Sequence, residues 1–133
     1  MSRLPLLALC LALPTVQAAS LNDYELSQML ERVAKQSSVG TPRAINADIL
    51  DQGYTVQGNE LINHLSVQEG HAGQMRGNPD AVREQLTGSV CRNTGYRQLL
   101  ARGAVLRYEF TEYKSNRPVI TERFKEADCA PQS

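Results

Sequence analysis

Residues 104–124, AVLRYEFTEYKSNRPVITERF, carry the clearest secondary-structure pattern of the chain. From Leu106 to Phe110 apolar and polar side chains alternate, which is the period of a strand with one buried face. A polar turn separates this strand from a second one that begins at Pro118, a residue that suits the start of a strand. The stretch predicts a β-hairpin in which Arg107 points away from the buried face.

A second hairpin is predicted upstream, between residues 54 and 67. Apolar and polar residues alternate on both sides of Gly58-Asn59, a pair that favours a tight turn. Asn63 interrupts the apolar alternation, so the sequence leaves open which face is buried at that point. Residues 45–50 fit either a strand or a helical turn, and both interpretations stay open.

Helical spacing of apolar residues predicts one helix before these hairpins. Asn22 and Glu25 have the spacing of an N-cap and its partner in a capping box. Apolar residues then recur at helical spacing, and Gly40 with Pro42 ends the helix. We expect an amphipathic helix of about four turns whose apolar stripe belongs to the core.

Two more helices are predicted between the hairpins. Asn78, followed by a proline, begins one that ends near Cys91, and Thr94 begins a shorter one that ends before Gly103. The glycine-rich residues 70–77 predict a loop. Together the elements indicate a two-layer α+β domain, in which the two hairpins form a four-stranded antiparallel sheet and the helices pack on one face.

The first eighteen residues have the pattern of a secretory signal peptide. Arg3 makes the start basic, residues 4–13 are apolar apart from one proline, and residues 16–18 place small side chains at the cleavage positions. The apolar run is about half as long as a membrane-spanning helix requires. We therefore expect residues 1–18 to be removed and 19–133 to form a single exported domain, secreted or periplasmic. A buried N-terminal helix or an uncleaved anchor is the alternative interpretation.

Three cysteines are present, and one of them lies in the predicted signal peptide. Cys10 would be the acylated residue of a lipoprotein, but Leu9 precedes it where a small residue is required. Cleavage leaves Cys91 and Cys129, and an even count in an exported chain indicates a disulfide. The alternative, a reactive thiol, has no C-x-x-C motif to support it.

Acidic and basic residues are balanced over the chain but separated along it. Removing Arg3 with the signal peptide leaves 13 basic and 14 acidic side chains, which does not favour nucleic acid or an anionic membrane as a partner. Residues 92–125 nevertheless have a net charge of +5. Either this region forms a basic face for an acidic protein partner, or its charges mix with the others on a solvated surface. The candidate partner-binding residues are Arg97, Arg102, Arg107, Arg117 and Arg123.

No arrangement of catalytic, cofactor-binding or metal-binding residues is recognisable in the sequence. His64 and His71 do not have the spacing of a metal site, and the motifs of serine hydrolases, P-loop proteins and zinc proteases are missing. Asp48, Asp51 and Glu60 are typical of a solvated surface. We expect a non-enzymatic protein without cofactors that acts through protein–protein interaction. The alternative is a periplasmic binding or accessory module, for example a secretion chaperone; the oligomeric state is open.

Three segments resemble a known family. They are VGTPR at residues 39–43, INADILDQGYTV at residues 45–56 and EFTEYKSNRP at residues 109–118. Through them the chain is similar to the putative quorum-sensing-regulated virulence factor family of short secreted Pseudomonas proteins. The resemblance implies a secreted α/β protein without assigned catalytic residues, and therefore a biological context rather than a mechanism.

Overall fold

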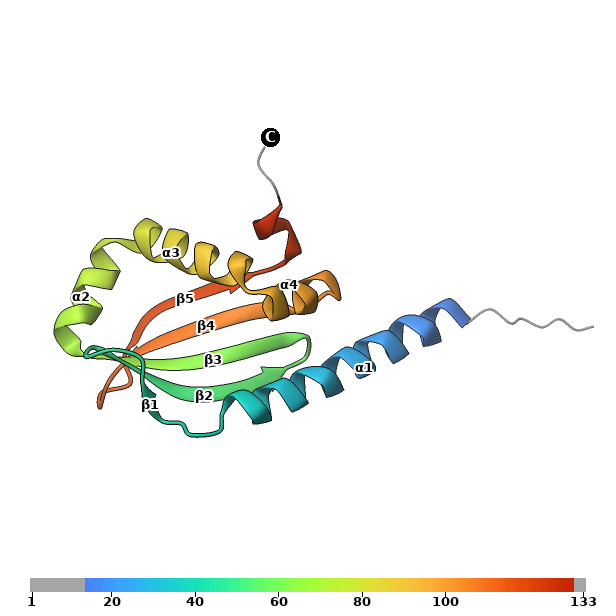
Figure 1. Ribbon diagram of the computed structural model, residues 1–133, viewed down its shortest axis with the longest axis horizontal. Coiled ribbons are helices and arrows are strands. Elements are labelled where there is room, and N and C mark those ends of the chain that lie inside the picture. Colours follow the sequence, from blue (N-terminus) through green and yellow to red (C-terminus); the bar gives the residue numbers. More distant parts are fainter. Residues whose placement is uncertain (1–13, 131–133) are drawn as a thin grey trace, which may run out of the picture.

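The computed structural model describes residues 14–130 of the chain, with side chains described from Leu21 onward. Residues 1–13, which include Cys10 and most of the expected signal peptide, and residues 131–133 lie outside the described part. The helices and strands follow one another (Figure 1) in the order α1 (Pro14–Ser37), β1 (Arg43–Ala44), β2 (Ile49–Gln57), β3 (Glu60–Val67), α2 (Glu69–Gly77), α3 (Pro79–Arg92), α4 (Thr94–Ala101), β4 (Val105–Glu112), β5 (Pro118–Phe124) and the 3-10 helix η1 (Glu126–Cys129).

All five of these strands belong to one mixed sheet, in the order β1-β2-β3-β4-β5. Neighbouring strands are antiparallel except β3 and β4, which run parallel. Both predicted hairpins are present, as β2–β3 and β4–β5, and the α+β class is confirmed. The prediction of four antiparallel strands is wrong, because β1 adds a fifth strand and the central pair is parallel.

The parallel pairing at the centre follows from the connection between the two hairpins. Parallel strands need a crossover of about a dozen residues or more, and three helices occupy the segment between Val67 and Val105. These helices return the chain to the end of the sheet where β3 starts, so that Glu60 lies opposite Val105. The alternation of apolar and polar residues is the same for either strand direction, and for that reason it did not predict this pairing.

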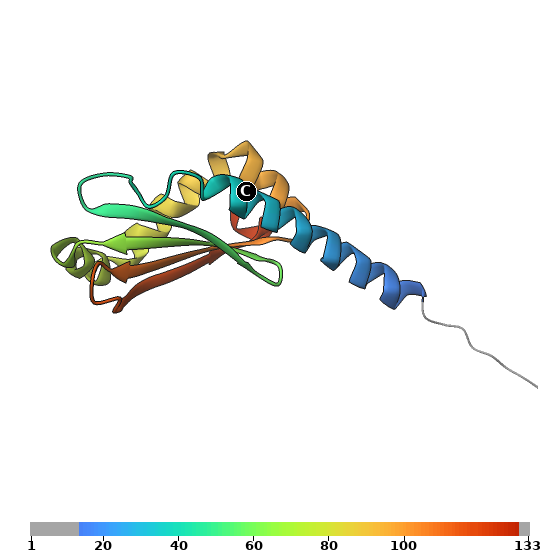
Figure 2. The ribbon, with the colours of Figure 1, turned by 90° about the horizontal axis from the view of Figure 1, so that it is seen from below.

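The helices cover one face of the sheet (Figure 2). That covered face is filled with buried aliphatic and aromatic side chains, among them Leu61, Leu65, Val67, Leu106, Phe110 and Phe124. Leu30 of α1, Val90 of α3 and Leu100 of α4 are each at most 2 % exposed and complete the core from the helical layer. Burial of such a side chain stabilises a fold by about 1.5–3 kcal/mol, so this face is the main source of stability.

Asn63, the residue that interrupts the apolar alternation of the β2–β3 hairpin, lies on the covered face of the sheet. Its amide donates to Asp51 Oδ1 at 3.0 Å and to the Gly53 carbonyl at 3.4 Å. Asp51 is only 4 % exposed and accepts the N–H of Gly53 at 2.9 Å, where β2 has a bulge. Buried polar groups that bond one another keep their hydrogen bonding on folding. Asn63 therefore links β3 to the bulge of β2 through hydrogen bonds.

The open question at residues 45–50 has a divided answer: residues 45–48 form a turn, and Ile49 and Leu50 belong to a strand. β2 begins at Ile49, and the two residues of β1 pair with Leu50 and Asp51 at its edge. Asn46 forms the turn between the two strands, since its side chain accepts two backbone N–H groups at 2.8 and 3.0 Å. The result is a very short edge strand that covers only the first part of β2.

Two predictions about helices are wrong. α1 begins at Pro14, so Asn22 lies inside the helix and not at its N-cap; the alanines and the leucine just before it are strong helix formers. Residues 70–77 belong to helix α2 and do not form a loop. Glycine disfavours a helix, but burial of Ala72 and Met75 against the core outweighs that local preference.

Candidate functional site

A groove of about 680 Å³ lies between α1 and α4 on the helical side of the sheet. Met29 and Val33 of α1 line one wall, and Tyr96 and Leu99 of α4 line the other. Arg102, the residue after α4, is the one charged side chain in the lining formed by the described residues. A concave, mostly apolar surface with few polar groups is the usual form of a binding site.

Three other hollows of the described surface differ from this groove in their charges. The hollow between α1 and β2, of about 670 Å³, is lined by both Glu31 and Lys35. The hollow on α3, of about 610 Å³, has two acidic and two basic side chains. The hollow beside β1, of about 320 Å³, contains Asp48 and no cation. Of these four hollows, the groove between α1 and α4 alone combines apolar walls with a cation and no acid.

Arg102 lies against the groove wall. Its Nη1 is 3.4 Å from the sulfur of Met29, and a thioether is only a weak acceptor. Among the residues that the structure describes, no carboxylate lies within ion-pair distance of Arg102. Its guanidinium has five N–H donors, and most of its capacity to bind an acid is therefore unused.

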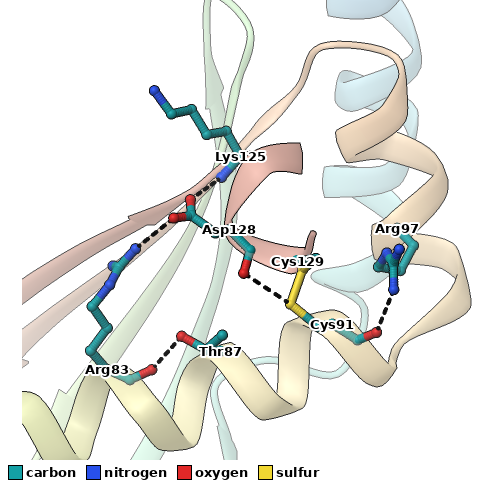
Figure 3. Close-up of a disulfide and its surroundings, with 7 residues drawn as sticks. All are labelled: Arg83, Thr87, Cys91, Arg97, Lys125, Asp128 and Cys129. Atoms are coloured by element: carbon teal, nitrogen blue, oxygen red, sulfur yellow. Dashed lines mark hydrogen bonds and ion pairs between the residues drawn. A yellow bond between two sulfur atoms is a disulfide. The ribbon is translucent and has the colours of Figure 1, made fainter. Parts of the chain in front are cut away.

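Hydrogen bonds fix the start of α4, and Figure 3 shows the one between Arg97 and Cys91. The side chain of Asn93 accepts the N–H of Tyr96 at 2.9 Å, which is a regular helix cap. Arg97 donates from Nη1 to the carbonyl of Cys91 at 3.2 Å. The wall of the groove that contains Tyr96 is therefore held to the end of α3.

The two cysteines of the expected mature chain lie together behind this wall. The structure joins Cys91 and Cys129 by a disulfide, with Cα atoms 5.4 Å apart. The short helix η1 is also tied to α3 by Asp128, which accepts from Arg83 Nη2 at 3.2 Å and from the Lys125 N–H at 2.8 Å. These contacts connect η1 to α3, the helix that directly precedes α4.

The base of the Tyr96 wall rests on the sheet. The hydroxyl groups of Tyr54 and Tyr96 are 3.2 Å apart and share a hydrogen bond. Burial, followed by this hydrogen bond, raises the pKa of Tyr54 far above its usual value. Burial likewise raises the pKa of the neighbouring Tyr108. Tyr54 and Tyr108 therefore stay neutral in the physiological range, so they support the wall and add no charge to the groove.

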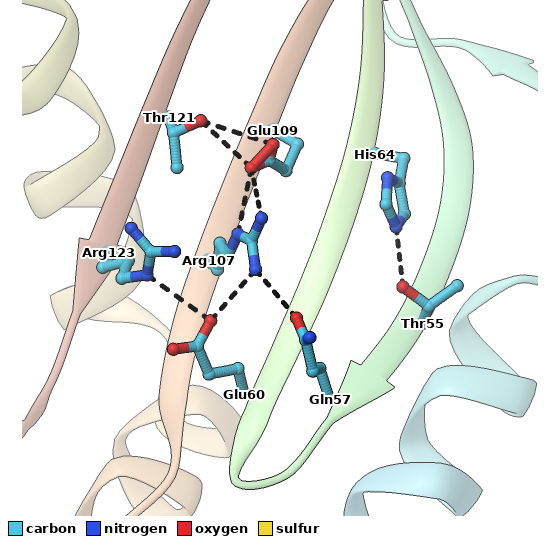
Figure 4. Close-up of polar contacts among 8 residues, drawn as sticks. All are labelled: Thr55, Gln57, Glu60, His64, Arg107, Glu109, Thr121 and Arg123. Carbon is cyan, nitrogen blue, oxygen red and sulfur yellow. Dashed lines mark hydrogen bonds and ion pairs between the residues drawn. The ribbon is translucent and has the colours of Figure 1, made fainter.

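On the uncovered face of the sheet, two of the candidate arginines lie in a charged network (Figure 4). Arg107 donates to Glu109 from Nη2 at 2.7 Å and to Glu60 from Nη1 at 3.3 Å. Arg123, opposite Arg107 on β5, also reaches Glu60, with Nε at 3.4 Å. The hydrogen bond with Glu109 raises the pKa of Arg107. Arg107 does point away from the core, as alternation predicted, but its charge is already paired with those of Glu109 and Glu60.

Within this network Glu109 accepts hydrogen bonds from both Arg107 and Thr121. Burial opposes its ionisation, but the hydrogen bonds from Arg107 and Thr121 outweigh that effect and lower the pKa of Glu109. Thr121 Oγ1 lies 3.0 Å from Glu109 Oε1. His64 is on the same face and bonds Thr55 Oγ1 through Nε2 at 2.7 Å.

Arg117 lies apart from the other candidates, in the turn between β4 and β5. Its Nη1 is 3.9 Å from the buried Glu112, which also pairs with Arg76 at 2.6 Å. Hydrogen bonds from Arg76 and then from Ser115 lower the pKa of Glu112. Arg117 is 70 % exposed and shares an acid that another arginine already holds.

The five candidate arginines thus occupy three places. Arg107 and Arg123 are neighbours on the uncovered face, Arg97 and Arg102 belong to the α4 region, and Arg117 is in the β4–β5 turn. Of the five, only Arg102 lines the groove.

The helical spacing of the apolar groove residues predicts that they belong to the core. A faint signal was available in α1, where Met29 and Val33 widen the stripe beyond one line of residues four apart.

Residues 14–130 contain neither a group of metal-ligating side chains nor a helix suited to cross a membrane. No three His, Cys, Asp or Glu side chains of this part gather into a group that could hold a metal ion. His71 lies 3.8 Å from Asp48, away from the Thr55 partner of His64. None of the described helices combines the length and the apolar character needed to cross a membrane.

Comparison with known proteins gives one family and one fold group. Residues 19–130 match the family described as "Putative quorum-sensing-regulated virulence factor". A crystal structure of a putative secreted protein from Pseudomonas aeruginosa is 73% identical, with a TM-score of 0.81 over 83% of this chain and 97% of that one. No protein of curated function matches the sequence significantly.

Two solved structures share the fold at low sequence identity. The pilotin EpsS of the type 2 secretion system of Vibrio vulnificus is 17% identical, with a TM-score of 0.73 over 85% of this chain and 99% of that one. The type II secretion system pilotin AspS of Vibrio cholerae is 15% identical, with a TM-score of 0.66 over 84% and 99%. At such identity the likeness extends to the fold alone.

Proposed function

The chain belongs to the putative quorum-sensing-regulated virulence factor family, and on this premise we propose that it is a non-enzymatic protein that acts by binding another protein. Its place of action is outside the cytoplasm, secreted or periplasmic, in keeping with the description of the 73% identical Pseudomonas aeruginosa protein. The proposal concerns how a protein of this family works there, which the family name leaves open.

The observation that carries the proposal is the groove between α1 and α4. Met29, Val33 and Leu99 present apolar surface at a hollow of about 680 Å³. Apolar surface that stays accessible in a folded protein favours association with a partner that covers it. The walls are set by the Asn93 cap and by the Tyr54–Tyr96 hydrogen bond, so the groove is formed before a partner arrives.

A second candidate function is an accessory role in secretion, within the periplasm. The fold shared with EpsS and AspS favours it, since both are pilotins of type 2 secretion systems. Deleting the gene separates the two candidates. An accessory protein is expected to leave fewer proteins in the culture medium when it is removed, whereas a protein that binds a partner on its own account leaves the secreted set otherwise unchanged.

Site-specific photocrosslinking in the producing bacterium tests the main proposal. A photoreactive amino acid at Gln98, an exposed residue in the groove lining, should yield a defined protein adduct in the exported fractions. Gln85 is equally an exposed glutamine, on α3 and outside that lining, and serves as the matched control. Adducts that are absent at Gln98, or identical at both positions, would contradict protein binding through this groove.

A further inference from the structure

We propose that the partner places a carboxylate, flanked by apolar side chains, against Arg102 in the groove between α1 and α4. This inference rests on the proposed function and names the chemistry of the partner: an acidic and apolar protein segment. Three observations lead to it, namely the unpaired charge of Arg102, the apolar walls on which that charge lies, and the ion pairs of Arg107, Arg117 and Arg123.

The position of Arg102 is the first step. Its guanidinium lies at 3.4 Å from the Met29 sulfur, and the described lining contains no acid that would compete for it. A cation beside apolar surface gains more from an incoming carboxylate than one in open water, because the partner excludes solvent from the pair. A planar guanidinium also suits a carboxylate, which it can hold with two parallel hydrogen bonds.

The walls determine the rest of the partner's chemistry. Val33 and Leu99 are rigid apolar contacts, whereas Met29 has a flexible side chain that adapts to the shape of what it meets. An acid alone would leave these walls exposed, and an apolar segment alone would bury Arg102 without a counter-charge, which is unfavourable. A segment that has both kinds of side chain satisfies the whole lining.

The paired arginines argue against the uncovered face as the site of such a contact. A carboxylate that approached Arg107 would compete with Glu109 at 2.7 Å and Glu60 at 3.3 Å. It would also meet repulsion from those two acids, since like charges in contact are unfavourable. At Arg102 no acid of the described residues would compete with the incoming carboxylate or repel it.

Two dyes that differ by one charged group test the groove chemistry without a known partner. The probe is 8-anilinonaphthalene-1-sulfonate, and its uncharged counterpart is N-phenyl-1-naphthylamine. We expect Arg102→Gln to weaken binding of the sulfonate about three- to fivefold, the size of an exposed ion pair, and to leave the uncharged dye unaffected. The salt dependence of sulfonate binding should disappear in the same variant.

Arg92→Gln is the matched control, because Arg92 is also exposed but belongs to the hollow on α3, where acids are present. It should change neither dye. Equal loss of both dyes in Arg102→Gln, or no loss of the sulfonate, overturns the assignment of Arg102. Thermal unfolding of each variant shows whether it is folded, and Arg102→Lys, which keeps the charge, should retain most of the sulfonate binding.

The protein identified by crosslinking at Gln98 permits the decisive experiment. Arg102→Glu should abolish its adduct, and replacing the acid in the crosslinked partner segment by arginine should restore it. A partner segment without Asp or Glu, or an adduct unchanged in Arg102→Glu, overturns the inference while protein binding stands. If the sulfonate result holds but no protein is crosslinked, the protein-binding proposal fails and the groove takes a small amphiphilic anion instead.

Discussion

Two arginines on opposite sides of this sheet, Arg107 and Arg102, differ in whether an acid pairs with them. On the uncovered face Arg107 has two carboxylates within 3.3 Å, and Arg123 shares one of them. On the helical side Arg102 has a methionine sulfur and, among the described residues, no acid. Both arginines come from the same basic stretch of sequence. A count of charges therefore does not identify a binding surface; what matters is whether the fold already supplies each charge with a partner.

The largest expected effect concerns the covered face as the source of stability. Phe124 is 1 % exposed, meets Tyr108 edge-to-face at 6.0 Å, and lies 4.4 Å from the Arg83 guanidinium. Phe124→Ala should reduce the free energy of unfolding by about 3–5 kcal/mol, measured by urea denaturation. Thr121→Ala, on the uncovered face of the same strand, should lose less than about 1.5 kcal/mol. Equal losses would mean that the two faces contribute alike.

The cysteine pair gives the next effect, because it secures the helical side where the groove lies. Cys129→Ser should reduce stability by about 2–4 kcal/mol in oxidised protein. The double variant Cys91→Ser with Cys129→Ser should match the single variant, since either change removes the same bridge. Two freely reactive thiols in the folded wild type would show that the bridge is absent from the exported protein.

The uncovered face should contribute a smaller, pH-dependent amount. Arg107→Gln is expected to lower stability by about 1 kcal/mol near pH 7, as for a networked surface pair. The pKa of Glu109 is lowered in the folded state, so its contribution is present above the unfolded-state pKa and is lost as the pH falls through the folded-state pKa. The difference in stability between wild type and variant should therefore begin to shrink as the pH falls below about 4 and should disappear below the folded-state pKa of Glu109. A difference that is constant from pH 7 to pH 3 would exclude ion pairing as its source.

The smallest effect on stability is expected at Arg102. Arg102→Gln should change the free energy of unfolding by less than about 0.5 kcal/mol, as for surface positions without a partner. The same change should be the one that weakens sulfonate binding. Destabilisation as large as that of Arg107→Gln would remove the contrast between an arginine that serves the fold and one that is available to a partner.

Local patterns predicted the hairpins well and the connection between them poorly. Alternation identified β4 and β5 and the outward direction of Arg107, because residues two apart in a strand share a face whatever the strand pairs with. Helix signals placed α3 and α4 near their observed starts at Pro79 and Thr94. α2 was missed, since its glycines are read as a loop until the burial of Met75 is known.

The candidate site was predicted only in part. The five arginines were proposed as a set, and the sequence could not divide them, because Glu60, which pairs with both Arg107 and Arg123, comes from another strand. Glu60 is 47 residues from Arg107 and reaches it through the parallel pairing of β3 with β4. The groove depended on a similar fact: Met29 and Arg102, 73 residues apart, are brought together by the packing of α1 and α4 on one face.

By itself, then, the sequence determined what depends on neighbouring residues: the strand period, the turns, the starts of α3 and α4, and the two cysteines left in the expected mature chain. The tertiary structure alone decided the parallel centre of the sheet, the short edge strand β1, and the division between paired and unpaired arginines. The physical reason is the distance along the sequence over which each kind of interaction acts. Periodicity and capping act over a few residues, whereas charge pairing and groove formation depend on which distant segments the sheet and its helical layer place side by side.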